Sequence, residues 1–294
     1  MDRAKVLHVY LDDGKRAQIA AGAAGIHTRI VGAAKAAGWQ VELHPVAAAP
    51  PSEGYHLVYN RTVDRPFCLS LRRCHMDPFF RIETTNDRWD WQVASLKFDA
   101  QNTPKRAAGF QTRWRQRLFH GLDITQDGFI FMPLQGKPDT RRHFQSMSPF
   151  KMIDATLLAE PHRKIVATLH PRESYSDHDL AKLRRFGPRF ELRPGPSMAL
   201  LAGCDLVVTQ NSGMALTGFF ADKPAVLFAR IDFHHIAASV PHIGVAAAFS
   251  TANAGPPPFA GYLDWFFRRQ AINATAADAE NQIRMRFQNL GWPM

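Results

Sequence analysis

The chain has 294 residues, of which 46% are hydrophobic and 21% are charged. This balance is typical of a folded protein with a hydrophobic core, and it excludes disorder of the whole chain. The formal net charge of +10 predicts attraction to anionic partners such as nucleotides, acidic glycans or anionic lipid head groups. No nucleic-acid recognition motif accompanies the charge, so a nucleic-acid partner is not expected.

The three cysteines, Cys68, Cys74 and Cys204, are too few and too scattered for a disulfide framework or a zinc site. Asp12 and Asp13 interrupt the apolar N-terminal segment, so no signal peptide is predicted. No apolar stretch approaches the roughly 20 residues of a membrane span. We therefore expect a cytoplasmic protein, with any membrane contact restricted to the periphery of the inner face.

The first half of the chain predicts a strand–helix–strand unit followed by further strands. Apolar runs indicate strands, and an alanine-rich segment indicates a helix by propensity. Strands are expected at 6–11, 39–43, 55–59 and 67–71, and helices at 18–37, 89–96 and 111–119.

The second half alternates strands and helices at the spacing of a doubly wound parallel sheet. Strands are expected at 129–134, 164–169, 190–192, 205–209 and 225–228, and helices at 149–159, 177–185, 196–202, 213–220 and 262–288. We therefore predict an α/β protein with two Rossmann-like domains and a cleft between them. The expected domains are residues 1–125 and 126–260, with 261–294 packing back on the body as a helix.

Polar residues follow two of the predicted strands in the second half, where ligands of open α/β sheets bind. His170 and Arg172 follow one strand, and Asn211, Ser212 and Gly213 follow another and open a helix. Free N–H groups at such a helix start favour a phosphate, which His170 could bind or protonate as a leaving group departs. The alternative is that Asn-Ser-Gly is only a helix cap and His-Pro only a turn.

Short blocks in this half occur in a characteristic order. They are Phe131-Met132-Pro133-Leu134-Gln135, then Asp139, Ser148-Pro149-Phe150, His170-Pro171-Arg172 and Val208-Thr209-Gln210-Asn211-Ser212-Gly213. Over roughly residues 129–235 these blocks resemble those of capsule polysaccharide biosynthesis proteins. That family has the two-domain GT-B glycosyltransferase fold and includes enzymes similar to Kdo transferases that use CMP-Kdo.

The resemblance implies a glycosyltransferase that moves Kdo or another acidic sugar from a CMP- or UDP-linked nucleotide-sugar. The acceptor would be a surface or capsular polysaccharide or a glycolipid. The second domain would bind the donor, with His170 and Ser212 at its phosphate and with Gln135 and Asp139 in a loop facing the cleft. The first domain would lie on the acceptor side.

The sequence departs from the family pattern at two positions. Thr168 stands where the family often has Lys, and Thr217 stands where it often has Glu. These departures favour an alternative, a non-catalytic nucleotide- or glycan-binding subunit of a polysaccharide assembly complex.

In the first half, Asp12 and Asp13 are the catalytic candidates, because they follow the first predicted strand. Such a carboxylate could deprotonate an acceptor hydroxyl or attack the anomeric carbon, although a solvated turn is the alternative. Glu83 is a weaker candidate. His234, His235 and His242 could suggest a metal, but adjacent histidines point in different directions and no carboxylate cluster accompanies them. No metal and no cofactor are expected.

Overall fold

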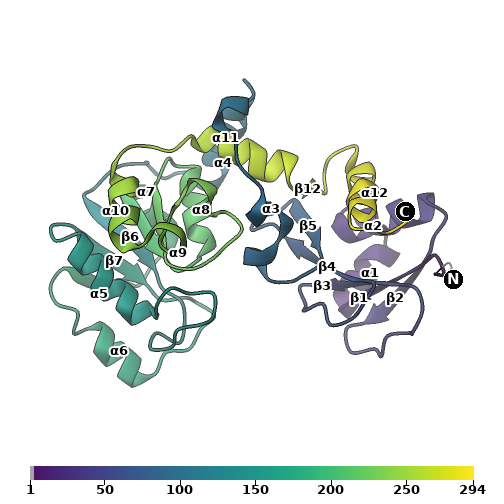
Figure 1. Cartoon of the computed structure of the whole chain (residues 1–294), viewed down its shortest axis with the longest axis horizontal. Coiled ribbons are helices and arrows are strands. Elements are labelled where there is room, and N and C mark those ends of the chain that lie inside the picture. Colours follow the sequence, from purple (N-terminus) through teal and green to yellow (C-terminus); the bar gives the residue numbers. More distant parts are fainter. Residues whose placement is uncertain (1–2) are drawn as a thin grey trace. The chain divides into compact units, whose positions relative to one another are not determined.

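The computed structural model describes residues 3–294 and divides into two compact units (Figure 1). The first unit contains residues 1–95 and 266–294, and the second contains residues 96–265. Each unit has one six-stranded sheet with helices, in agreement with the predicted α/β class. The division differs from the expected boundary at 125, because residues 96–125 belong to the second unit and the end of the chain belongs to the first.

The first unit has a sheet in the order β12-β5-β4-β3-β1-β2. Strands β2, β1, β3 and β4 are parallel, whereas β5 and β12 are antiparallel to their neighbours. The elements are β1 (Val6–Leu11), α1 (Asp13–Ala20), α2 (Ile26–Ala36), β2 (Gln40–Pro45), β3 (Tyr55–Tyr59), β4 (Cys68–Arg73), β5 (Phe79–Glu83), the 3₁₀ turn η1 (Arg88–Asp90), α3 (Gln92–Ser95), β12 (Ile272–Asn273) and α12 (Ala279–Asn289).

The core of this unit lies on one face of its sheet. Leu7, Val9 and Leu11 alternate along β1 toward this face, where α2 and α12 lie side by side (Figure 1). Because successive side chains of a strand point to opposite faces, His8 and Tyr10 belong to the other face. That face is therefore polar, although both side chains are buried.

Two expectations for this unit are wrong in part. The helix expected at 18–37 is interrupted, because Gly22 adopts a left-handed backbone conformation (φ 67°) and separates α1 from α2. The helix expected at 262–288 is broken into α11 (Phe259–Leu263), the π-helical turn η4 (Asp264–Arg269), the short strand β12 and α12. Strand β5 was not predicted.

The second unit has a sheet in the order β11-β10-β9-β6-β7-β8, and all its pairs are parallel. Its core clusters around Ile130, Ile165 and Val208. The remaining elements are η2 (Ala100–Asn102), α4 (Ala107–Leu118), β6 (Phe129–Pro133), α5 (Pro149–Ala159), β7 (Lys164–Thr168), α6 (Asp177–Leu183), β8 (Phe190–Leu192), α7 (Ser197–Gly203), β9 (Leu206–Thr209), α8 (Gly213–Phe219), β10 (Ala225–Leu227), η3 (His234–Ile236), β11 (Ala238–Ser239), α9 (Val240–Ile243) and α10 (Val245–Asn253).

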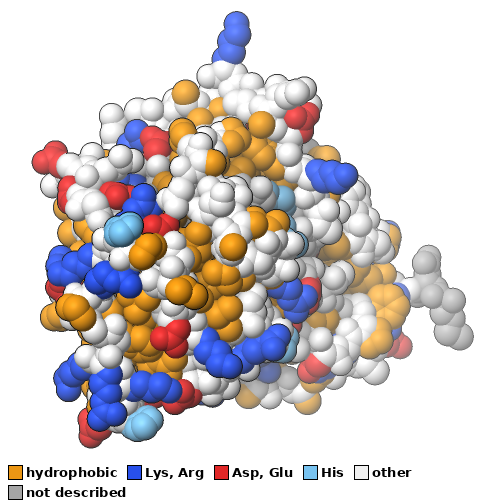
Figure 2. Space-filling view, turned by 60° about the vertical axis from the view of Figure 1, so that its left-hand side comes forward, with side chains coloured by type: hydrophobic (Ala, Val, Ile, Leu, Met, Phe, Trp, Pro, Cys, Tyr) orange, Lys and Arg blue, Asp and Glu red, His pale blue; other side chains and the backbone are white. Residues whose placement is uncertain are grey.

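Figure 2 shows Lys and Arg interleaved with acidic and apolar side chains on the face turned toward the viewer. Across residues 3–294, no helix combines the length and the apolar character that crossing a bilayer requires.

A buried ion-pair cluster joins α12 to β5 in the first unit. Glu83 is 3% exposed and accepts from Arg81 at 3.0 Å, and its other oxygen lies 2.6 Å from Arg286 of α12. The same oxygen accepts from the backbone N–H of Gln92 at 3.2 Å. One carboxylate thus compensates two guanidinium groups away from water.

Replacing Glu83 by Gln should therefore destabilise the first unit by about 3–5 kcal/mol, because two buried cations lose their counter-charge. Urea unfolding measures this change. The matched control is Glu280→Gln, which removes a half-exposed pair with Arg29 and should cost about 0–1 kcal/mol. Equal effects of the two substitutions would contradict the structural role of Glu83.

Candidate functional site

The carboxyl ends of three parallel strands lie together in the second unit. Strand β6 is flanked by β9 on one side and β7 on the other. The Thr209 hydroxyl donates to the carbonyl of Pro133 at 3.0 Å, and the N–H of Leu134 donates to the carbonyl of Thr168 at 2.9 Å. These bonds hold the three strand ends level, so the loops that follow them leave the sheet at one edge.

Two amide side chains meet at this edge. Gln135, after β6, donates from Nε2 to Oδ1 of Asn211, after β9, at 2.8 Å. The Asn211 amide also donates to the carbonyl of Arg230 at 3.4 Å. The Oε1 atom of Gln135 is buried and has no hydrogen-bond partner among the described residues. Because an unsatisfied buried oxygen is costly, a donor group that reached this acceptor would be bound favourably.

The loop after β7 fixes the tautomer of His170. The N–H of Arg172 donates to Nδ1 of His170 at 3.2 Å, and the backbone N–H of His170 donates to the Tyr175 hydroxyl at 3.1 Å. Since Nδ1 accepts, we assign the proton of the neutral ring to Nε2. The ring is partly exposed, and its Nε2–H can donate to an anion.

The loops after β6 and β7 also touch each other. An added Cβ at Gly136 would lie 2.8 Å from the Cβ of Glu173, so these two turns approach as closely as glycine allows. Arg142 donates to the carbonyl of Gly136 at 2.9 Å and supports the same turn. Gln135 and His170 are therefore positioned by directly packed turns.

Ser212 caps helix α8, as expected. Its hydroxyl oxygen accepts from the N–H of Met214 at 3.3 Å, which leaves the hydroxyl proton free to donate elsewhere. Gly213 is the first residue of the helix. Strands β7 and β9 are separated by β6, so the loops of His170 and Ser212 start roughly 10 Å apart, with the Gln135 loop between them.

Two other predicted residues have different surroundings. Asp139 pairs with Lys182 of α6 at 2.6 Å, and Arg172 is exposed on the turn after β7. The structure therefore brings Gln135 and Asn211 into direct contact, whereas Asp139 makes its ion pair with a neighbouring helix.

Thr168 and Thr217, the two residues that depart from the family pattern, both contact neighbouring groups of the second unit. Thr168 is buried at the end of β7, and its hydroxyl lies 3.4 Å from that of Ser197. The Thr217 hydroxyl donates to the carbonyl of Gly213 at 3.1 Å, within α8. Neither position supplies a charge to the site.

In the first unit, Asp12 caps α1 directly after β1. Its carboxylate accepts from the N–H of Lys15 at 2.9 Å and pairs with the Lys15 ammonium. The side-chain hydrogen bond from Lys15 lowers the pKa of Asp12, so this carboxylate is ionised at neutral pH. Asp13 is fully solvated apart from its pair with Arg16.

Several other candidates are engaged in packing. Glu83 belongs to the buried cluster described above. His234 bonds the carbonyl of Ile231 at 2.7 Å, and His242 bonds the Ser239 hydroxyl at 2.7 Å. The three cysteines are buried free thiols. Burial raises the pKa of Cys204 to about 12.

Sequence reasoning missed one buried amide at this edge. Gln210 is 1% exposed, and its Nε2 donates to the carbonyl of Met147 at 3.0 Å. Its Oε1 is buried without a partner among the described residues. The sequence did contain a signal for Gln210, because it directly follows an apolar strand. Buried polar side chains are uncommon, so a glutamine at such a position indicates a specific role.

The sequence matches no family model and no curated protein. The structure resembles a β-Kdo 2,7-transferase structure of Thermosulfurimonas dismutans KpsC, with a TM-score of 0.52 and 12% identity over 84% of this chain and 89% of that one. It also resembles a β-Kdo 2,4-transferase structure of the same protein, with a TM-score of 0.50 and 12% identity over 90% and 99%. These likenesses show a GT-B glycosyltransferase fold with two Rossmann-like domains.

The contact between the turns at Gly136 and Glu173 can be tested with a compensating pair. Gly136→Ala should lower the melting temperature, because its Cβ overlaps the Cβ of Glu173. The double variant Gly136→Ala/Glu173→Gly should restore most of the loss, since the overlapping atoms are removed. A double variant no more stable than Gly136→Ala would contradict the packing.

Proposed function

We propose that this protein is a glycosyltransferase that moves a sugar from a nucleotide-sugar donor to a surface or capsular polysaccharide or glycolipid acceptor. The observation that carries the proposal is the strand-end constellation of the second unit, in which Gln135, His170 and Asn211 occupy the edge where α/β sheets bind ligands. The GT-B fold supports the same reaction class.

In this proposal the donor phosphate lies between the loops of His170 and Ser212. The Nε2–H of His170 and the Ser212 hydroxyl donate to phosphate oxygens, and Arg172 adds positive charge. As the bond between the anomeric carbon and the phosphate oxygen breaks, negative charge grows on the leaving nucleotide. Donors placed at that oxygen stabilise the transition state more than the bound substrate.

The donor is a CMP- or UDP-linked sugar, with Kdo or another acidic sugar as the preferred group. The amide oxygen of Gln135 has no hydrogen-bond partner among the described residues and suits a hydroxyl donor of a sugar. The net charge of +10 favours an acidic acceptor and peripheral contact with the anionic inner leaflet of a cytoplasmic membrane.

His170→Ala should lower the transfer rate by about 100-fold or more, because it removes the proposed donor to the leaving group. The measurement is donor hydrolysis and transfer across a panel of CMP- and UDP-linked sugars. His178→Ala, an exposed histidine on nearby α6, is the matched control and should retain full activity. Undiminished turnover by His170→Ala would remove this residue from the mechanism.

Substitution with Asn distinguishes the roles of Asp12 and Asp13, the two adjacent carboxylates of the first unit. We propose that Asp12, which directly follows β1 and caps α1, is the carboxylate that acts on the acceptor or on the anomeric carbon. Asp12→Asn keeps a good helix cap but removes the charge, so transfer should fall at least 100-fold while the melting temperature changes little. Asp13→Asn is the control. A larger loss with Asp13→Asn would assign the role to Asp13.

The alternative is a non-catalytic nucleotide- or glycan-binding subunit. Its specific support is the absence of charge at Thr168 and Thr217, which bond only to neighbouring protein groups. Nucleotide binding that His170→Ala weakens, without turnover of any donor in the panel, would favour this alternative.

A further inference from the structure

A row of titratable side chains crosses the polar face of the first sheet. The register pairs His8 of β1 with Glu42 of edge strand β2 and with His56 of β3. His44, two residues beyond Glu42, lies on the same face, opposite Tyr10. Three of these residues, His8, Glu42 and His44, bring their ligand atoms together.

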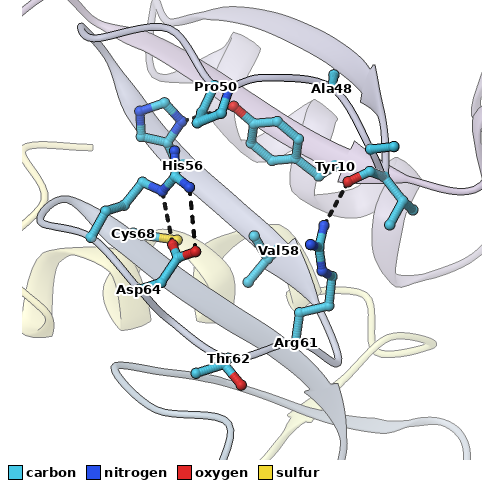
Figure 3. Close-up of a pocket in the computed structure, with 12 residues that line it drawn as sticks. Tyr10, Ala48, Pro50, His56, Val58, Arg61, Thr62, Asp64 and Cys68 are labelled. Carbon is cyan, nitrogen blue, oxygen red and sulfur yellow. Dashed lines mark hydrogen bonds and ion pairs between the residues drawn. The ribbon is translucent and has the colours of Figure 1, made fainter.

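The loops that follow β2 and β3 cover part of this face. They enclose a pocket of about 110 Å³ beside Tyr10 and His56 (Figure 3). The Tyr10 hydroxyl and Nδ1 of His56 are 3.0 Å apart, and the His56 ring stacks on His8 with centroids 5.1 Å apart. Tyr10 stacks in turn on His44 at 5.1 Å. The two imidazoles of the cluster are therefore held in place by packed rings.

The three ligand atoms form a nearly regular triangle. Nδ1 of His8 lies 3.0 Å from Nε2 of His44 and 3.2 Å from Oε2 of Glu42. Nε2 of His44 lies 3.6 Å from the same Glu42 oxygen. Ligand atoms about 2.0–2.1 Å from a tetrahedral ion are roughly 3.3–3.4 Å from one another. The triangle therefore has the dimensions of one face of such a coordination shell.

All three atoms can present lone pairs to a cation at this point. The Nε2 edge of His8 lies against the backbone of Gly54, and we assign the proton of the neutral ring to that nitrogen. Nδ1 of His8 and the Glu42 carboxylate then both present lone pairs, and only Nε2 of His44 can carry a hydrogen between them. A metal ion would accept all three lone pairs.

We propose that His8, Glu42 and His44 form a binding site for one divalent transition-metal ion of the Zn²⁺ class. Two imidazoles and a carboxylate are ligands that suit Zn²⁺ and exclude Mg²⁺ or Ca²⁺ as the preferred ion. The Glu42 side chain is 52% exposed, so the ion can enter from solvent and keep a water as fourth ligand. The bound ion clamps edge strand β2 to β1, and this role does not rest on the proposed transferase activity.

The test is a titration of the full chain, freed of metal by chelation, with Co²⁺ and then Zn²⁺. We expect one Co²⁺ per chain, the intense visible absorption of a four-coordinate site, displacement by Zn²⁺ and a higher melting temperature with metal. Glu42→Gln should weaken binding at least tenfold, and His44→Ala should abolish the four-coordinate spectrum.

His162→Ala is the matched control, because it removes an exposed histidine of the second unit. It should bind Co²⁺ as the wild type does. Glu42→Gln changes a half-exposed side chain, so it decides the question even if His44→Ala fails to fold. Wild-type binding no tighter than that of Glu42→Gln, a weak six-coordinate spectrum, or loss of binding in His162→Ala would overturn the proposal.

Discussion

Hydrogen bonding between parallel strands is the constraint on which the candidate site depends. Backbone N–H and C=O groups inside the second unit must pair, and the apolar strands β6, β7 and β9 satisfy them by aligning in the same direction. Their carboxyl ends consequently fall at one edge, although His170 and Asn211 are some 40 residues apart in the chain. The side chains that follow these strands then need only short turns to meet. A change that shifted one strand would displace its functional residue together with it.

Much of the second unit could be predicted, because its signals are local. Apolar runs marked β6, β7 and β9, and Ser148 with Pro149 gave α5 an N-cap and a first-turn proline. The first unit was harder. Alanine propensity favoured one helix at 18–37, but Gly22 takes a left-handed conformation that ends α1. Strand β5 forms a hairpin with its neighbour β4 and also pairs with the distant β12. The broken C-terminal segment depends on this long-range pairing of β12 with β5, which no local pattern specifies.

The candidate site likewise combines features that the sequence predicts locally with contacts that depend on the folded chain. His170, Gln135, Asn211 and Ser212 were predictable as strand-end residues, because topology alone places them at one edge. Their partners were not, since the path of each loop determines that Gln135 contacts Asn211 whereas Asp139 pairs with Lys182. The cluster of His8, Glu42 and His44 was missed for a different reason. Its signal was three polar residues, two within the predicted strands 6–11 and 39–43 and one directly after the second strand, and their meaning depends on the register between β1 and β2.

The membership of residues 266–294 in the first unit has a consequence for synthesis. The second unit, 96–265, is continuous in sequence, so all its strands emerge from the ribosome before residues 266–294 do. The first unit cannot complete its core or its sheet until residues 266–294 have been made. Helix α12 contributes Ile283 and Phe287 to the core, and β12 adds the edge strand beside β5. During translation residues 3–95 therefore expose apolar surface until residues 266–294 have been made, whereas the second unit can already have folded.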